Sequence, residues 1–109
     1  MRGLKASFMQ PPDELYANMG MQPAGTYHVL ATAWDDHSLY TTFHTPVEGP
    51  GKNEPVMWTV KAGEGRVFAT MLGHSVPAIQ NAGFRATFTR GVEWAATGVV
   101  TQPPPPGMQ

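Results

Sequence analysis

Hydrophobic and polar positions form three short runs that predict β-strands, at residues 27–34, 55–61 and 66–72. The first run, YHVLATAW, is apolar on both faces, which is typical of a strand covered by helices on both sides. The second and third runs are separated by the short, glycine-containing stretch AGEG. Two strands joined in this way predict an antiparallel hairpin.

After the third run the pattern changes to the spacing of an amphipathic helix over residues 84–96. Its apolar positions recur every three or four residues: Phe84, Phe88, Val92 and Ala95. Gly91 costs such a helix up to about 1 kcal/mol relative to alanine, and we expect close packing against the sheet as its reason. Gly98 marks the end of the helix. Residues 77–80 predict an earlier helical turn, which Gly83 interrupts.

The segments outside these elements are less regular. Residues 6–10 predict a brief strand that the following prolines end, and residues 13–19 predict a short helix with Asp13 as its N-cap. Residues 35–53 predict a long loop, of the kind that serves as a lid or a flexible connection. Residues 99–109 contain four consecutive prolines and predict an extended, polyproline-like linker or a frayed end.

Composition narrows the class of protein. The chain of 109 residues is 41% hydrophobic, which favours one small folded domain over a disordered chain. Its formal net charge is −1 and no basic cluster is interleaved with aromatic residues, so we expect no nucleic-acid partner. No apolar run is long enough to cross a membrane, and we expect no membrane partner. Cysteine is absent, which excludes a cysteine nucleophile within these residues and leaves the compartment open.

One histidine occupies a place where α/β folds usually put their chemistry. His74 follows Gly73 at the C-terminal end of the third predicted strand. It is therefore our candidate for a general acid or base, a role that needs a partner within hydrogen-bond distance and an orienting group. The alternative is that His74 only ends the strand and bonds to local backbone.

Seven short stretches match a known family in their residues and in their order along the chain. They are RGL (2–4), DELY (13–16), VLATA (29–33), EPVMW (54–58), GEGRVF (63–68), LGH (72–74) and RGVEWAA (90–96). Through this ordered set, which covers roughly residues 1–101, the chain resembles the C-terminal half of ThuA-like domains, which are named for trehalose utilisation.

The resemblance implies a fold class: α/β, a flavodoxin-like three-layer sandwich around a mostly parallel sheet, similar to that of class I glutamine amidotransferases. Residues 1–101 are then a partial ThuA-like domain whose N-terminal half is absent, with a β-hairpin and a C-terminal amphipathic helix, and residues 102–109 are a proline-rich tail. Half of a sheet exposes a strand edge. We therefore expect a chain that is marginally stable, a homodimer, or bound to a partner that completes the sheet.

The same resemblance bears on His74. In the related amidotransferases a histidine at a comparable place is the base for a cysteine, and a glutamate two residues later orients it. Here that later position is Val76 and cysteine is absent, so that triad cannot be assembled from these residues. The resemblance implies instead a domain of carbohydrate utilisation in which His74 acts on a sugar, or a non-catalytic sugar-binding or accessory module. Whether the chain is an enzyme stays open.

The candidates for binding a carbohydrate are Glu14, Tyr16, Glu54, Trp58 and Arg66. Carboxylates and a phenol bond sugar hydroxyls, an indole stacks on a sugar ring, and an arginine clamps an anion with two hydrogen bonds. Each has a structural alternative. Glu14 also suits the first turn of a helix, and Tyr16 also suits a half-buried anchor. Trp58 also suits the core, and Glu54 also suits the end of a strand. Arg66 also suits an ion pair with Glu54 or Glu64.

Metal and cofactor binding find no support in the sequence. His28, His37 and His44 do not have the spacing of a metal site, and no paired ligand motif includes them. We therefore expect neither a metal nor a cofactor from these residues, and the ligand we expect is a small-molecule carbohydrate.

Overall fold

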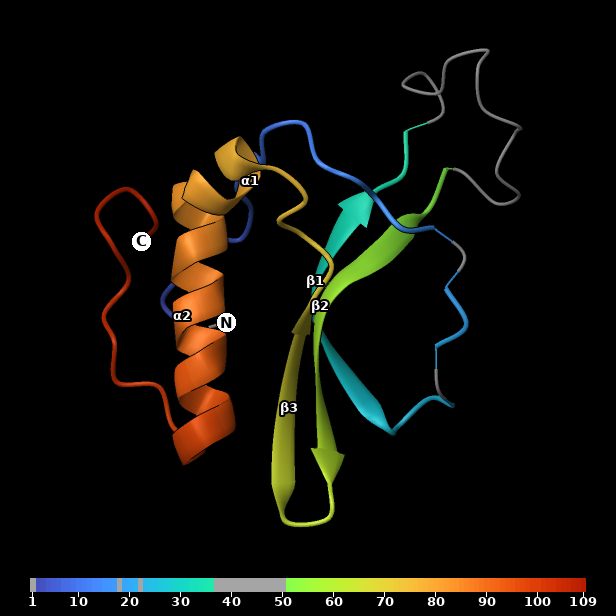
Figure 1. Ribbon diagram of the computed structural model, residues 1–109, viewed down its shortest axis with the longest axis vertical. Coiled ribbons are helices and arrows are strands. Elements are labelled where there is room, and N and C mark those ends of the chain that lie inside the picture. The colour runs from blue at the N-terminus through green and yellow to red at the C-terminus, as the bar shows by residue number, and fades with distance from the viewer. Residues whose placement is uncertain (1, 18, 22, 37–50) are drawn as a thin grey trace.

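The computed structural model describes residues 2–17, 19–21, 23–36 and 51–109. Its sheet has the strand order β1-β2-β3, and each strand is antiparallel to its neighbour (Figure 1). The strands are β1 Tyr27–Trp34, β2 Asn53–Ala62 and β3 Gly65–Thr70. All three predicted strands are therefore confirmed, and so is the hairpin, which turns between β2 and β3 at Gly63 and Glu64.

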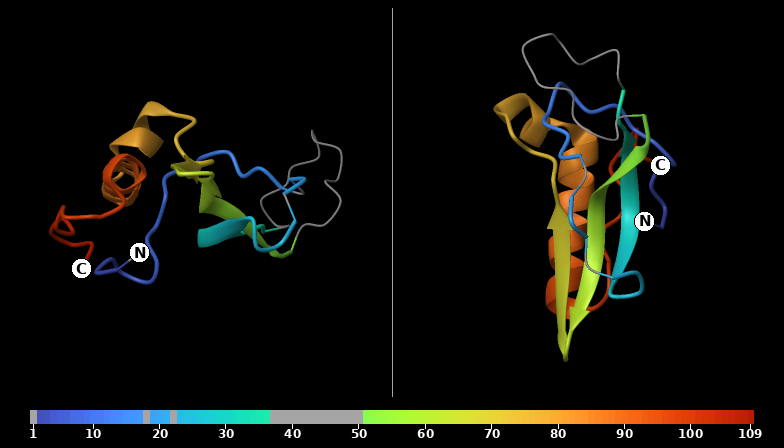
Figure 2. Two further views of the ribbon diagram at one scale, coloured as in Figure 1. Left: turned by 90° about the horizontal axis from the view of Figure 1, so that it is seen from below. Right: turned by 90° about the vertical axis from the view of Figure 1, so that its right-hand side faces the viewer.

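The described sheet differs from the mostly parallel sheet that the family resemblance implies, because both of its strand pairs are antiparallel. The sequence predicts that helices cover both faces of β1, but no helix among the described elements packs against it. It is an edge strand, and half-buried and exposed residues alternate along much of it. Among the described elements, helix α2 (Ala82–Thr97) packs against β3 and against the short helix α1 (Val76–Gln80). Figure 2 shows α2 on one side of the sheet and the N-terminal segment, residues 10–17, on the other.

Helices α1 and α2 are separated at Asn81, and not at Gly83 as the sequence predicts. The backbone of Asn81 leaves the helical conformation with ψ of 135°, and its side chain accepts hydrogen bonds from the amides of Gly83 and Phe84. An N-cap that satisfies two amides starts the helix at this point, so Gly83 lies inside the first turn. At the other end Gly98 closes α2 with φ of 83°, as predicted, and its amide donates to the carbonyl of Trp94.

Helix α2 approaches the sheet most closely where Gly91 lies against Phe68 of β3. A Cβ atom at Gly91 would stand 2.4 Å from the Phe68 ring, so a larger residue cannot be accommodated without a shift. The prediction that Gly91 serves close packing against the sheet is therefore confirmed. Burial of the aromatic ring offsets the helix propensity that glycine lacks.

The buried face of α2 differs from the apolar stripe that the periodicity predicts. Its buried residues are Gly83, Phe84, Ala86, Thr87 and Gly91. Phe88 and Val92 of the predicted stripe remain 44% and 49% exposed. Small residues let the helix backbone come close to the sheet, and in this orientation Phe84 is buried while Phe88 and Val92 lie on the flank of the helix.

The predicted strand at residues 6–10 and the predicted helix at residues 13–19 are both wrong. The described residues of these segments contain neither strand nor helix. Residues 6–10 pair with no strand of the described sheet. Asp13 does not cap a helix of its own, because its carboxylate accepts hydrogen bonds from backbone amides about sixty residues away in the sequence.

The C-terminal tail packs against α2 and is not a frayed end. Figure 1 shows it running back along the helix. Glu93 of α2 accepts hydrogen bonds from the amides of Thr101 and Gln102. Near the end of the tail Met108 is buried, and its carbonyl accepts a hydrogen bond of 2.9 Å from the amide of Lys5. The four prolines restrict the unfolded tail, so its docking costs less backbone entropy.

Most of the loop predicted at residues 35–53 lies outside the described residues, and its last residue begins β2. None of the helices in the described part of the chain has both the length and the apolar character needed to cross a membrane.

Candidate functional site

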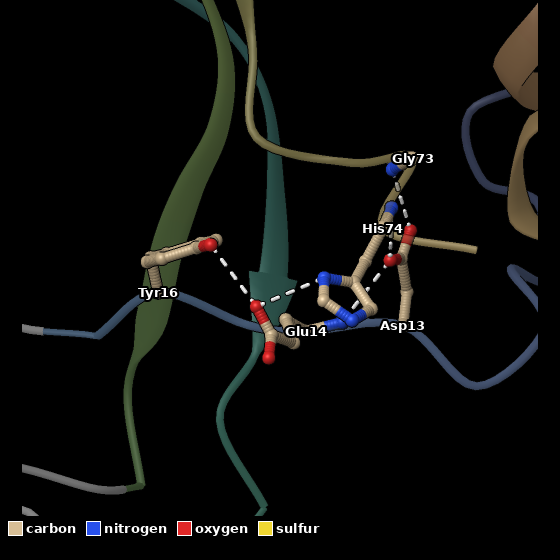
Figure 3. Close-up of polar contacts among 5 residues, drawn as sticks. All are labelled: Asp13, Glu14, Tyr16, Gly73 and His74. Atoms are coloured by element: carbon tan, nitrogen blue, oxygen red, sulfur yellow. Dashed lines mark hydrogen bonds and ion pairs between the residues drawn. The ribbon is translucent and has the colours of Figure 1, made fainter.

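The carboxylate of Asp13 connects the N-terminal segment, by hydrogen bonds, to the loop between β3 and α1. Asp13 accepts a hydrogen bond from the amide of Gly73 at 2.8 Å and another from the amide of His74 at 2.9 Å (Figure 3). Gly73 has φ of 110°, which favours glycine, and a Cβ atom there would stand 2.9 Å from the ring of Phe84. The chain therefore turns at Gly73 and presents two successive amides to Asp13.

Next to this carboxylate, three side chains meet at one oxygen atom. Oε2 of Glu14 lies 3.2 Å from Nδ1 of His74 and accepts a hydrogen bond of 3.0 Å from the phenol of Tyr16 (Figure 3). We call Glu14, Tyr16 and His74 the polar cluster. Asp13 also accepts a hydrogen bond from the amide of Glu14, so it holds the backbone of two of the three members. The side chains of His74 and Glu14 are 62% and 53% exposed, so a ligand can reach them.

These contacts set the ionisation of two groups. Partial burial by itself raises the pKa of Asp13, but hydrogen bonds from the amides of Gly73 and His74, with two further donors, outweigh burial and hold the pKa below its ordinary 3.8. The hydrogen bond from Tyr16 to Glu14, with the charge of that carboxylate, raises the pKa of Tyr16 above its ordinary 10.0. At neutral pH Asp13 is therefore ionised, and Tyr16 keeps the proton that it donates to Glu14.

The polar cluster pairs an imidazole with a carboxylate that orients it. A neutral His74 that donates from Nδ1 to Glu14 carries its lone pair on Nε2, and in this form histidine can accept a proton from a substrate. The carboxylate stabilises the imidazolium that results, as in the catalytic pairs of hydrolases. Glu14 and Tyr16 add an acceptor and a donor that suit hydroxyl groups.

The sequence identifies Glu14, Tyr16 and His74 as candidate site residues, but it does not predict that their side chains contact one another. An orienting acid is expected two residues after His74, where Val76 stands, and the structure supplies Glu14 from the N-terminal segment instead. The role of Asp13 is missed altogether, because its position before an acid and an apolar pair predicts a helix N-cap. The only signal in the sequence is that DELY and LGH both belong to the set of stretches shared with the family.

Two of the other predicted binding residues lie in β2, away from the polar cluster. Glu54 is buried, and its carboxylate lies 3.1 Å from Nζ of Lys52. Trp58 is half-buried and lies opposite Val29 of β1 and Ala69 of β3. The structure therefore places both residues within the sheet.

Arg66 is engaged at the C-terminal end of α2. Its Nε donates to the carbonyl of Trp94 at 3.2 Å, and a terminal nitrogen donates to the carbonyl of Ala96 at 3.3 Å. These carbonyls have few partners within the helix, and a cation beside them complements the helix dipole. Arg66 thus joins β3 to α2 and lies apart from the polar cluster.

A separate cavity of about 650 Å³ lies between α2 and the face of β1 and β2. His28, Leu30 and Thr59 line it from the sheet, and Arg90 and Trp94 line it from the helix. No member of the polar cluster lines this cavity.

The histidines weighed as metal ligands are not assembled into a site in the described part of the chain. His28 lies on β1 at the cavity, and His37 and His44 lie outside the described residues. Within the described ranges, no three histidine, aspartate or glutamate side chains are placed to hold a metal ion together.

Comparison with known proteins identifies one family. The family described as ThuA, trehalose utilisation, matches the chain over residues 1–95. The comparisons with curated proteins and with solved structures gave no match. The matched range includes Asp13 and all three members of the polar cluster.

Proposed function

The chain belongs to the ThuA family of trehalose utilisation, and from this premise we propose that its polar cluster binds a small carbohydrate. In this proposal His74, oriented by Glu14, transfers a proton to or from the sugar, while Glu14 and Tyr16 hold its hydroxyl groups. One observation carries the proposal: Oε2 of Glu14 meets both Nδ1 of His74 and the phenol of Tyr16. An imidazole beside a carboxylate that orients it is well suited to acid–base catalysis.

The chemistry of the cluster suits a sugar better than an anion or an apolar ligand. Sugar hydroxyls both donate and accept hydrogen bonds, and the cluster offers a carboxylate acceptor, a phenol and an imidazole. Two carboxylates, Asp13 and Glu14, lie together at the site and would repel a phosphate or a carboxylate ligand. Glu54, Trp58 and Arg66 take no part in the proposed site.

We also propose that residues 1–101 form part of a larger, flavodoxin-like three-layer sandwich, with residues 102–109 as its tail. Family membership supports this proposal, and so does the lack of a helix over β1 among the described elements. The exposed cluster would then be completed by a second wall. A structure of a longer family member in which the equivalent of β1 faces solvent on both sides would contradict this part of the proposal.

The binding proposal is tested by titrating trehalose, and a panel of other mono- and disaccharides, into the isotopically labelled chain while its amide resonances are followed by NMR. We expect the largest shifts at Glu14, Gly73 and His74. His74→Gln and Glu14→Gln should each weaken binding about tenfold, which corresponds to about 1.4 kcal/mol for one lost charged hydrogen bond.

Two matched substitutions serve as controls. His28→Gln on β1 and Glu64→Gln in the hairpin turn make the same chemical changes at exposed positions outside the cluster. Both variants should bind sugar as the wild type does. Sugar-induced shifts confined to the cavity of His28, or equal binding by all four variants, would remove the polar cluster from the proposed role.

A second candidate function is sugar binding without catalysis. The exposure of the His74 and Glu14 side chains favours it, because no described wall excludes water from the imidazole and its carboxylate. Incubation of the chain with each bound sugar, followed by product analysis, separates the two functions. Turnover that His74→Gln abolishes supports acid–base catalysis, whereas binding with no product supports the accessory module.

A further inference from the structure

The side chain of Gln10 joins the carboxylate of Asp13 to helix α1. Its Nε2 donates to Oδ2 of Asp13 at 3.0 Å and to the carbonyl of Ala78 in α1 at 3.3 Å. A side-chain amide carries two N–H hydrogens, so one nitrogen can serve both acceptors. Among the described residues, the other donors to this carboxylate are backbone amides. Gln10 is therefore the side chain that relates Asp13 to a helix, and Ala78 at its other end is buried.

The two oxygens of Asp13 hold different parts of the site. Oδ2 accepts from the amide of Gly73 and from Gln10. Oδ1 accepts from the amides of Glu14 and His74. The last torsion of an aspartate side chain has broad energy wells, so a carboxylate turns readily unless its partners prevent it. A donor anchored on α1 limits this rotation and keeps Oδ1 directed at the two amides.

The chain around Gln10 is built to bring it to Asp13. Prolines 11–12 separate the two residues, and proline fixes the φ angle of the backbone. In the extended conformation that prolines favour there are three residues per turn, so residues three apart lie on one side of the chain. The backbone just before Gln10 is held as well, because the side chain of Asn81 donates to the carbonyl of Met9 at 3.0 Å.

The chain after Asp13 has an inner and an outer side. Exposed and half-buried residues alternate over residues 13–17, as in an extended chain whose side chains point in opposite directions in turn. Asp13 lies on the inner side, and Glu14 and Tyr16 lie exposed on the outer side. The direction of the Asp13 carboxylate thus sets the rotation of this chain. That rotation in turn decides where Oε2 of Glu14 lies relative to Nδ1 of His74.

We infer that Gln10 is a positioning residue for the polar cluster. Its amide, held on α1, directs the Asp13 carboxylate, and that carboxylate keeps the backbones of Glu14 and His74 at the spacing where their side chains meet. Gln10 is not a member of the cluster and is not expected to contact a sugar. Its part in proton transfer rests on the proposed function, but the contact that it maintains can be measured without a sugar.

The position requires the donors of glutamine and not only its size. Oε1 of Gln10 is buried and has no hydrogen-bond partner among the described residues, so the amide is used here for its two hydrogens. Methionine has a similar length and no donor. Glutamate has the same shape, but its ionised carboxylate offers only acceptors and would repel Asp13. Gln10→Met and Gln10→Glu therefore separate hydrogen bonding from packing.

The tautomer of His74 reports the contact directly. The hydrogen bond of one ring nitrogen sets which nitrogen carries the proton, so the contact with Glu14 favours the neutral form protonated at Nδ1. The ¹⁵N shifts of the ring, measured in mildly alkaline buffer where free imidazole is neutral, give the ratio of the two tautomers. The signals of His74 are identified by their loss in His74→Gln. A change in global stability alone would leave this ratio unchanged in the folded protein.

We expect the Nδ1-protonated form to predominate in the wild type. Gln10→Met should lower the ratio of this form to the other at least about threefold, and Gln10→Glu should lower it further. Gln80→Met makes the same chemical change at an exposed position of α1 and should leave the ratio as in the wild type. Dispersed amide resonances of β2 and β3 show for each variant that the fold is kept.

A measurement on the wild type keeps the test decisive if a variant does not fold. The side-chain amide hydrogens of Gln10 should show nuclear Overhauser contacts to hydrogens of Ala78 or Ile79, and the absence of these contacts would overturn the inference. So would a tautomer ratio that Gln10→Met leaves unchanged, or one that Gln80→Met lowers equally.

Binding of the sugar panel separates this inference from the proposed function. For a sugar that binds the wild type, Gln10→Met should weaken binding by less than the roughly tenfold loss expected of His74→Gln. If no sugar binds, the proposed function fails, and the tautomer ratios still decide the role of Gln10. If sugar binds while Gln10→Met leaves the tautomer ratio unchanged, the role of Gln10 fails and the proposed function stands.

Discussion

Replacement of Asp13 by asparagine tests how the site is held together. Asparagine keeps the size of aspartate but offers one neutral oxygen, and its NH₂ group faces an amide that needs an acceptor. In the wild type two amides, those of Gly73 and His74, donate to the charged carboxylate at 2.8 and 2.9 Å. A hydrogen bond to a charged group contributes about 1.5–3 kcal/mol, and partial exposure of this site favours the lower end. We expect Asp13→Asn to lower the free energy of unfolding by about 2 kcal/mol at neutral pH.

The pH dependence of this difference follows from the sign of the pKa shift. The folded pKa of Asp13 lies below its ordinary value of 3.8, so the carboxylate stabilises the fold fully at pH values above 3.8. The stabilisation is lost as the pH falls below 3.8 and through the folded pKa. The gap in stability between wild type and Asp13→Asn should therefore be constant near neutral pH and close in acid.

Urea unfolding at several pH values measures this gap. Both proteins must be compared at one protein concentration, because association of copies would shift apparent stability. Glu64→Gln in the hairpin turn, which neutralises an exposed acid, is the control and should unfold as the wild type does at neutral pH. Equal stability of Asp13→Asn and the wild type at neutral pH, or a gap that stays the same in acid, would refute the role given to Asp13.

Two further predictions concern packing and the tail. Gly91→Ala should lower the free energy of unfolding by about 1–3 kcal/mol despite the higher helix propensity of alanine, because the new Cβ atom would overlap the ring of Phe68. Gly20→Ala, where an added Cβ atom meets nothing within 4 Å, is the matched control, and equal thermal stability of the two variants would contradict the packing argument. Hydrogen bonds from the side chain and the amide of Thr101 hold the pKa of Glu93 below its ordinary 4.5, so the tail should loosen as the pH falls through that lowered pKa. A lower protection factor of the Thr101 amide, relative to its intrinsic exchange rate at each pH, would show this in acid and in Glu93→Gln at neutral pH, whereas a protection factor that responds to neither change would refute it.

Local patterns were sufficient to find most of the regular elements. Short apolar runs rich in β-forming residues mark the three strands, and the short AGEG connection marks the hairpin. Gly98 ends α2 where the apolar repeat stops, and Gly91 lies against the sheet as its cost to the helix suggests. These predictions succeed because strand and helix periodicity, and glycine at a helix end, are encoded within a few neighbouring residues.

Predictions failed where a distant partner competed with a local preference. Asp13 has the local signature of an N-cap, yet its carboxylate binds the amides after β3 and the predicted helix does not form. Phe88 and Val92 have the spacing of a core stripe, yet the small residues of α2 face the sheet. The proline-rich tail lacks periodicity, yet contacts with Glu93 dock it on the helix.

The amino-acid sequence by itself determined the three strands and the two helices of this protein, its membership of the family, and His74 as a residue that closely follows a strand. Only the tertiary structure decided that Glu14 lies beside His74 and that the phenol of Tyr16 shares the same carboxylate oxygen. The reason is physical. Secondary structure depends on side chains a few positions apart, whereas the geometry of the polar cluster depends on where the folded chain brings together residues that lie about sixty positions apart.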